Sequence, residues 1–212
     1  MSDKIQKYEG KEITVYFDAP RCIHAGRCVH GLPDVFRANV PGPWINPDAA
    51  DADTLARLIE SCPSGALRYE RKSGSREAAP ATSSITVEAD GPLTAYGDFT
   101  INGEAQPAPR ATLCRCGVSK TKPWCDGSHA EAGFSDAGDV QPFNPDEEPQ
   151  TGSVDIKTLK DGPLYLAGPH SICDSDGKVA RVCAKSALCR CGASKSKPYC
   201  DGSHAAVGFT SD

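Results

Sequence analysis

The sequence has no apolar run long enough to cross a bilayer, for which about 20 consecutive apolar residues are needed. Only 39% of its 212 residues are hydrophobic, so such a run would stand out. The first ten residues, MSDKIQKYEG, are charged where a secretory signal would be apolar. We therefore expect a cytoplasmic protein with no membrane partner.

An excess of basic residues is also missing. The net charge is -5, and no basic tail or aromatic-basic patch offsets it, so nucleic acid is not expected as a partner. The motifs GxGxxG, GxxxxGK and HExxH, which bind dinucleotides, nucleotide phosphates and catalytic zinc, do not occur. Nucleotide-dependent and peptidase activities therefore have no support, and we expect a protein that is not an enzyme.

Cysteine, by contrast, is abundant. Eleven cysteines, an odd number, argue against a disulfide framework and favour a reducing compartment. Six of them fall in a segment that occurs twice, 75 positions apart: CRCGVSKTKPWCDGSH from Cys114 to His129, and CRCGASKSKPYCDGSH from Cys189 to His204. Each copy keeps three cysteines and one histidine at the same spacing, which indicates two copies of one metal site.

The four candidate ligands of each copy form two pairs. Side chains alternate along an extended segment, so the cysteines of a CxC pair lie on one face and can bind one metal. The third cysteine and the histidine are four residues apart, and on a helical turn they would face a second metal together. A structural zinc site with three cysteines and one histidine is the alternative. Common zinc pairs are spaced CxxC or wider, however, so the spacing favours an iron-sulfur cluster.

The pattern CxCxxSxxxPxCDGSH, matched in both copies, resembles the CDGSH iron-sulfur family, to which the mitoNEET proteins belong. The resemblance implies one 2Fe-2S cluster per copy, with the CxC cysteines on one iron and the third cysteine and the histidine on the other. Members of the family pair two such units, usually as a homodimer with swapped strands. Two units in one chain imply a monomer with internal pseudo-two-fold symmetry. The implied ligands are Cys114, Cys116, Cys125 and His129, and then Cys189, Cys191, Cys200 and His204.

The repeat extends beyond the motif. The tetrapeptide DGPL begins at Asp90 and again at Asp161, 71 positions later, so the second copy carries four extra residues before its motif. Short alternating runs at 85–88 and 164–167 are typical of strands.

Two changes in composition divide the chain into three modules. Residues 73–84 are mostly small, and residues 136–153 hold five acids, no bases and three prolines, which is typical of linkers. We expect a ferredoxin-like domain at 1–73, a first CDGSH domain at 84–136 and a second CDGSH domain at 153–212.

Three cysteines define the first module. Cys62 is followed by proline, and Cys22 and Cys28 match the first and third cysteines of the CxxCxxC run that bacterial ferredoxins combine with a distant Cys-Pro. The module resembles a single-cluster ferredoxin in which Ala25 occupies the second position. Three thiolates are what a 3Fe-4S cluster needs, so that cluster is expected on Cys22, Cys28 and Cys62. A 4Fe-4S cluster is the alternative if a residue such as His24 supplies a fourth ligand.

The rest of this module predicts a small mixed fold. Residues 11–17 alternate as a strand, residues 53–61 form an amphipathic helix with Asp53 as its N-cap, and a short strand follows around 67–69. The predicted fold class is therefore α+β, with a small ferredoxin-like domain followed by two β-rich CDGSH units that form an intramolecular pseudo-dimer.

These expectations favour a soluble electron carrier with two 2Fe-2S clusters and one 3Fe-4S or 4Fe-4S cluster, whose partner is a redox protein. The competing class is iron-sulfur cluster storage or transfer, or redox or iron sensing, which resembles roles proposed for the CDGSH family. Its partner would be an apo-acceptor protein. Cys173 and Cys183 lie outside the motifs and are expected to be free thiols, and His170 is expected to be structural.

Overall fold

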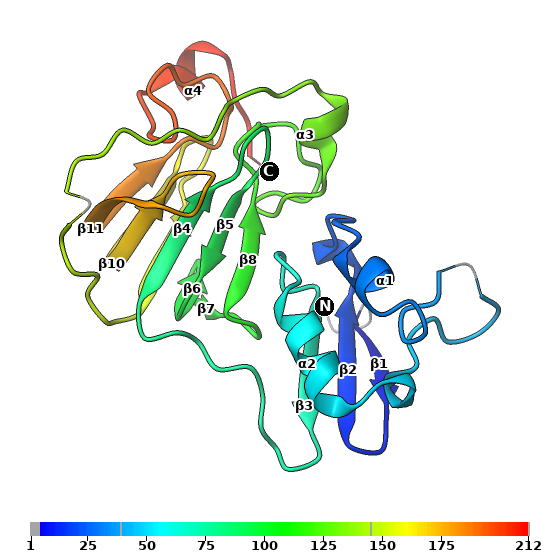
Figure 1. Ribbon diagram of the computed structural model, residues 1–212. Coiled ribbons are helices and arrows are strands. Elements are labelled where there is room, and N and C mark those ends of the chain that lie inside the picture. The colour runs from blue at the N-terminus through cyan, green and yellow to red at the C-terminus, as the bar shows by residue number, and fades with distance from the viewer. Residues whose placement is uncertain (1–4, 39, 145, 212) are drawn as a thin grey trace. The chain divides into compact units, whose positions relative to one another are not determined.

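The computed structural model describes residues 5–38, 40–144 and 146–211 (Figure 1). The chain divides into two compact units, Met1–Ala78 and Ala79–Asp212. Both CDGSH copies belong to the second unit. Residues 1–4, 39, 145 and 212, which fall in the expected domains 1–73 and 153–212 and in the acidic linker, lie outside the described residues. Among the helices of the described part, none is both long and apolar enough to span a bilayer.

The first unit is a three-stranded antiparallel sheet covered by short helices. Its strand order is β1-β2-β3. Val15, Leu55 and Ile59 are fully buried between the sheet and the helices. The elements are β1 (Ile5–Glu9), β2 (Ile13–Asp18), the 3-10 turn η1 (Ala19–Arg21), α1 (Arg27–Gly31), the 3-10 turn η2 (Pro47–Ala49), α2 (Ala52–Glu60) and β3 (Leu67–Arg71).

Helix α2 begins earlier than the sequence predicts. Its N-cap is Asp51, whose carboxylate accepts a hydrogen bond from the backbone N–H of Thr54 at 2.9 Å. The predicted cap, Asp53, lies inside the first turn and instead pairs with Arg71 on β3 at 2.6 Å. Either aspartate could cap a helix by its residue type, and the hydrogen bond from Thr54 identifies Asp51 as the N-cap.

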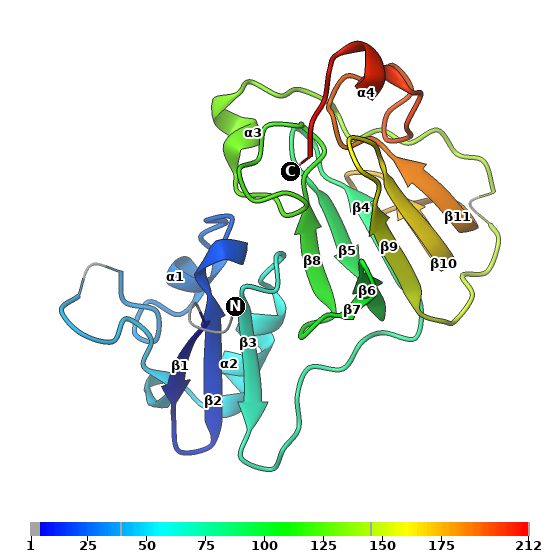
Figure 2. The same cartoon turned by 180° about the vertical axis from the view of Figure 1, so that it is seen from behind.

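The second unit is an eight-stranded sheet with two short helices. The strand order is β7-β6-β9-β10-β4-β5-β8, and β11 pairs with β10. Helices α3 and α4 lie at the same end of the sheet in Figure 1 and, from behind, in Figure 2. The elements are β4 (Ser83–Val87), β5 (Leu93–Tyr96), β6 (Phe99–Ile101), β7 (Glu104–Ala105), β8 (Arg110–Leu113), α3 (Ser128–Glu131), β9 (Val154–Thr158), β10 (Leu164–Cys173), β11 (Val179–Leu188) and α4 (Ser203–Ala206).

The two repeats exchange strands within this sheet. Strand β6 of the first repeat runs parallel to β9 of the second, with Phe99 opposite Val154. The second half of β10 runs parallel to β4, with His170 opposite Ser83. Residues 99 and 170 are equivalent in the two repeats, and so are residues 83 and 154. The members of each pair are 71 positions apart, the same offset as the DGPL repeat. Each repeat therefore completes the sheet of the other.

One hydrophobic core serves both repeats. Val87 and Leu93 of the first repeat and Ile156 and Leu164 of the second are fully buried members of the same cluster. The fold is mostly β with few helices, which agrees with the predicted α+β class.

Candidate metal centres

The CxC cysteines of each repeat form a close pair of thiols. The Sγ atoms of Cys114 and Cys116 are 3.6 Å apart, and those of Cys189 and Cys191 are 3.7 Å apart. Two thiolates bound to one metal at about 2.3 Å with a tetrahedral angle lie about 3.8 Å apart. Each pair therefore has the separation that two ligands of one metal need.

The third cysteine and the histidine form a second pair. The Sγ atom of Cys125 lies 3.3 Å from Nδ1 of His129, and that of Cys200 lies 3.4 Å from Nδ1 of His204. A thiolate and an imidazole on one tetrahedral metal lie about 3.6 Å apart. Across the described residues, no group of three or more cysteine, histidine or acidic side chains is arranged around one metal position. The candidate ligands of each repeat thus form two separate pairs.

The expected helical turn between cysteine and histidine is wrong. Helix α3 begins at Ser128 and α4 at Ser203, so only the histidine of each pair is helical. Gly127 and Gly202, each with a φ of 87°, lie directly before the helices. The prediction placed the cysteine and the histidine on one face of a helix. In the structure a glycine in the left-handed conformation turns the chain and brings the two side chains together.

Motif residues between the ligands hold the loop in place. In the second repeat, the Ser194 hydroxyl donates to Tyr199 O at 2.7 Å, and the Asp201 carboxylate accepts from the N–H groups of Lys195 and Ser203. These backbone hydrogen bonds lower the pKa of Asp201. The same bonds occur in the first repeat, with Ser119 and Asp126 as the corresponding side chains. The serine and aspartate of the motif therefore fix the loop that carries the ligands.

The thiols differ in how readily they lose a proton. The hydrogen bond from Cys116 lowers the pKa of Cys114 to about 6. Burial raises the pKa of Cys125 to about 11. Thiols bind metal as thiolates, so metal must displace a proton from Cys125 at neutral pH.

A buried arginine lies between the two CxC cysteines of each repeat. Arg115 is 2% exposed and Arg190 is 3% exposed. Each guanidinium donates through Nε to a glycine carbonyl, Gly91 O at 2.8 Å and Gly162 O at 2.9 Å. Both repeats therefore place one buried positive charge beside their candidate ligands.

The two arginines differ in one partner. Arg115 also forms an ion pair with Asp136, Nη1 to Oδ1, at 2.6 Å. The position equivalent to Asp136 is Ser211, because both residues donate their backbone N–H to an aspartate at matching positions, Asp90 and Asp161. The second repeat has no carboxylate at this position, so the two candidate centres are not electrostatically equal.

The two motifs meet at one of their ligands. Cys116 and Cys191 form an antiparallel β-bridge. Gly117 and Gly192 have φ values of 86° and 79°, and an added Cβ would lie 2.6 Å from Cys191 O and 2.7 Å from Cys116 O. Only glycine allows this approach, so the CRCG sequence of each motif brings a ligand of one centre next to a ligand of the other.

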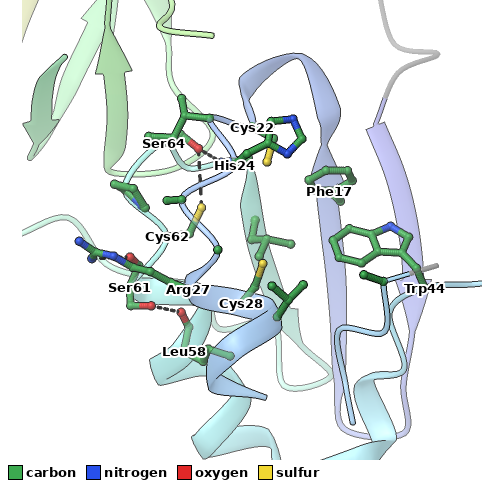
Figure 3. Close-up of a pocket in the computed structure, with 18 residues that line it drawn as sticks. Phe17, Cys22, His24, Arg27, Cys28, Trp44, Leu58, Ser61, Cys62 and Ser64 are labelled. Atoms are coloured by element: carbon green, nitrogen blue, oxygen red, sulfur yellow. Dashed lines mark hydrogen bonds between the residues drawn. The ribbon is translucent and has the colours of Figure 1, made fainter. Parts of the chain in front are cut away.

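The first unit contains a cavity of about 390 Å³ lined by all three of its predicted ligands, Cys22, Cys28 and Cys62. Figure 3 shows these cysteines on one side of it and the rings of Phe17 and Trp44 on the other. The walls are mainly apolar, and burial raises the pKa of the Cys22 and Cys28 thiols. The cavity is a candidate metal-cluster site with three thiols.

Local structure places each of these cysteines. Cys22 follows η1, Cys28 lies in α1, and Cys62 follows α2 with its Sγ 3.7 Å from Ser64 Oγ. His24 also lines the cavity, and its φ of 55° is left-handed. The structure thus places His24 at the same cavity as the three cysteines.

All eleven cysteines are free thiols. Cys173 is buried at the end of β10. Cys183 is half-buried on β11, and its Sγ lies 3.3 Å from Nε2 of His170. The sequence motifs indicate no relation between Cys183 and His170, so this contact was not expected. A residue-by-residue comparison of the two repeats would have pointed to it, because the first repeat has Phe99 at the place of His170.

Two family models match parts of this chain. Residues 8–72 match the family model described as "Divergent 4Fe-4S mono-cluster". Residues 90–130 and 161–205 each match the model described as "Iron-binding zinc finger CDGSH type". The first unit is similar to the uncharacterized protein YjdI of Escherichia coli K12 and to that of Escherichia coli O157:H7. Each is 45% identical over 65 residues, which is 31% of this chain and 84% of YjdI. No solved structure matches the chain.

Proposed function

The chain belongs to the divergent 4Fe-4S mono-cluster family through its first unit and carries two CDGSH domains after it, and from this premise we propose that it is an electron carrier with three iron-sulfur clusters. An iron-sulfur cluster takes up or releases an electron without a change of ligands. The residues of the chain bind the clusters, bury them and set the charge around them.

The arrangement of the candidate ligands in each repeat carries this proposal. Four ligands in two pairs suit a 2Fe-2S cluster, in which each iron has two protein ligands, better than one zinc ion with four. The proposed ligands are Cys114, Cys116, Cys125 and His129 for one cluster, and Cys189, Cys191, Cys200 and His204 for the other.

The contact between the motifs favours electron transfer. Cys116 and Cys191 face each other across a β-bridge, where paired Cα atoms lie about 5 Å apart. An electron that passes between the two centres would cross this short contact inside one compact unit. The exchanged strands support a pseudo-dimer of the two repeats, which would keep the contact fixed without a second subunit.

The first unit is proposed to hold one cubane-type cluster on Cys22, Cys28 and Cys62. Three thiols suit a 3Fe-4S cluster, whereas the matched family description favours 4Fe-4S with a fourth ligand such as His24. Electron paramagnetic resonance of the oxidised protein distinguishes the two, because oxidised 3Fe-4S is paramagnetic and 4Fe-4S in its usual oxidised state is not. If His24 is a ligand, His24→Ala converts a silent oxidised protein into one with a 3Fe-4S signal.

The decisive experiment begins with iron and acid-labile sulfide analysis of anaerobically purified protein. Three clusters give seven or eight irons, and a zinc protein gives no sulfide. The loaded protein is then reduced with dithionite, mixed with oxidised cytochrome c and followed by visible absorbance. We expect rapid reoxidation with all iron retained. Slow reoxidation, or loss of iron during one cycle, would refute the carrier function. We place this function in the cytoplasm, because eleven free cysteines fit a reducing compartment.

Cluster transfer or sensing is the second candidate. The exposure of the second repeat favours it, because Cys200 is half-buried where its counterpart Cys125 is only 2% exposed. A half-buried ligand is open to exchange with an acceptor thiol. Transfer of the cluster to an apo-ferredoxin within minutes, followed by the absorbance of the separated acceptor, would favour this function over electron transfer.

A further inference from the structure

A cysteine, a histidine and a serine lie together on β10 and β11, outside the proposed ligands. His170 and Cys183 are directly opposite each other in the β10–β11 pair, and Cys183 Sγ is 3.3 Å from His170 Nε2. Ser186 Oγ is 2.8 Å from the same nitrogen. His170 is 1% exposed, whereas Cys183 is half-buried and so reaches the surface.

The backbone fixes which nitrogen of His170 carries the proton. Nδ1 lies 2.8 Å from Gly168 O, and a carbonyl oxygen only accepts, so Nδ1 is the donor. Nε2 of the neutral ring is therefore an acceptor that faces both the thiol and the hydroxyl. This is the arrangement of a base beside a nucleophile, with the backbone carbonyl as the group that orients the base.

The first repeat shows that the fold does not need these polar side chains. Phe99 stands at the place of His170, and Ala111 stands at the place of Ser186, as the strand registers require. Both apolar residues are buried in the core. The second repeat thus has a histidine and a serine where the first has apolar side chains, while His170 keeps the parallel pairing to β4 that Phe99 has to β9.

Two charged groups act on the Cys183 thiol, one from its own strand and one from another segment. Burial raises the pKa of Cys183, Arg181 on the same strand lowers it, and Glu147 on the segment before β9 raises it. Burial also lowers the pKa of His170. Thiol and imidazole are therefore both neutral at rest, and the proton moves only when the sulfur reacts.

We propose that Cys183 is a reactive thiol that hydrogen peroxide oxidises to a sulfenic acid, with His170 as the general base. The sulfur attacks one peroxide oxygen, so an S–O bond forms as the O–O bond breaks. The thiol proton passes to Nε2 of His170 and then to the leaving hydroxide, which departs as water. The sulfur loses two electrons and the peroxide gains them. This proposal does not depend on the electron-carrier function.

The cluster-loaded protein is treated with hydrogen peroxide in the presence of dimedone, and mass spectrometry measures the rate of labelling at Cys183. Cys173 is the internal control, because it is a free thiol of the same strand pair and no histidine contact is found for it among the described residues. A general base typically contributes about 100-fold, and Cys173 is also the more buried of the two thiols, so we expect Cys183 to react at least about tenfold faster than Cys173.

Two variants separate a chemical role from a structural one. His170→Phe copies the first repeat and should slow labelling of Cys183 by about tenfold or more. Ser186→Ala also copies the first repeat, but it removes the hydroxyl that competes for Nε2, so it should speed labelling. Far-ultraviolet circular dichroism checks that both variants fold. Equal rates at Cys183 and Cys173, an unchanged rate in His170→Phe, or equal slowing in both variants would overturn the proposal.

Discussion

Asp136 is one of the charges that distinguish the surroundings of the two candidate CDGSH centres. Its carboxylate neutralises the buried Arg115 at 2.6 Å, whereas Ser211 occupies the equivalent position near Arg190. The remaining charges of the two motifs match: Arg115, Lys120, Lys122 and Asp126 correspond to Arg190, Lys195, Lys197 and Asp201. At this position the first candidate centre therefore has one carboxylate more than the second. Reduction adds negative charge, so the second cluster should accept an electron first.

The charge difference sets the size of this effect. Arg115 connects the ligands Cys114 and Cys116, so Asp136 is separated from the centre by one arginine side chain. At a separation of about 10 Å and an effective dielectric constant of about 20, one unit charge contributes about 1.7 kcal/mol. For a one-electron couple this energy corresponds to about 70 mV. The Asp136 carboxylate alone should lower the potential of the first proposed cluster by about this amount.

Asp136→Ser and Ser211→Asp are the perturbations, and a potentiometric titration followed by electron paramagnetic resonance is the assay. Asp136→Ser should raise the potential of the first proposed cluster toward that of the second, and Ser211→Asp should lower that of the second. Asp176→Ser, a change of the same charge in the turn after β10, controls for net charge. Among the described residues no ion pair between Arg190 and a carboxylate is found, so Asp136→Ser should fold. If both variants keep their clusters and their wild-type titration curves, the electrostatic reasoning is wrong.

Three further changes test the framework of the two units by chemical denaturation. Gly117→Ala should lower the free energy of unfolding by about 3 kcal/mol, because the new Cβ would lie too close to a carbonyl oxygen. Gly103 has a similar φ but open space around it, so Gly103→Ala should cost only about 1 kcal/mol. Equal losses in the two variants would contradict the close contact. Asp51→Ala removes the N-cap of α2 and should cost about 1 kcal/mol, and no loss would argue against the cap. Burial and the hydrogen bond to Glu60 raise the pKa of Tyr69 to about 12. Its contribution is complete below pH 10 and is lost as the pH rises through 12, so Tyr69→Phe should cost about 1 kcal/mol at pH 8 and progressively less between pH 10 and 12; a difference independent of pH would contradict this linkage.

Local chemistry made part of the structure predictable. Cys114 and Cys116 were expected to act as a pair because their spacing alone brings them to one face, and the strands and helix of the first unit follow from alternation and amphipathic spacing. The N-cap of α2 was assigned to Asp53 instead of Asp51, because two aspartates stand at the start of the helix and residue type alone does not distinguish them. The pairing of β6 with β9 is similarly distant in sequence. The contact of Cys183 with His170 depends on the register between two strands, which composition and motifs do not specify.

The exchange of strands between the repeats has a consequence for how the two centres can differ. In a symmetric dimer of identical chains, every substitution occurs in both halves, and a charge placed beside one centre is placed beside the other. Here the two halves are joined by one chain, so their association does not depend on protein concentration and each half can change alone. Two such independent changes are Asp136, where the second repeat has Ser211, and His170, where the first repeat has Phe99. Fusion of the two repeats in one chain therefore allows the two copies of the motif to acquire different functions.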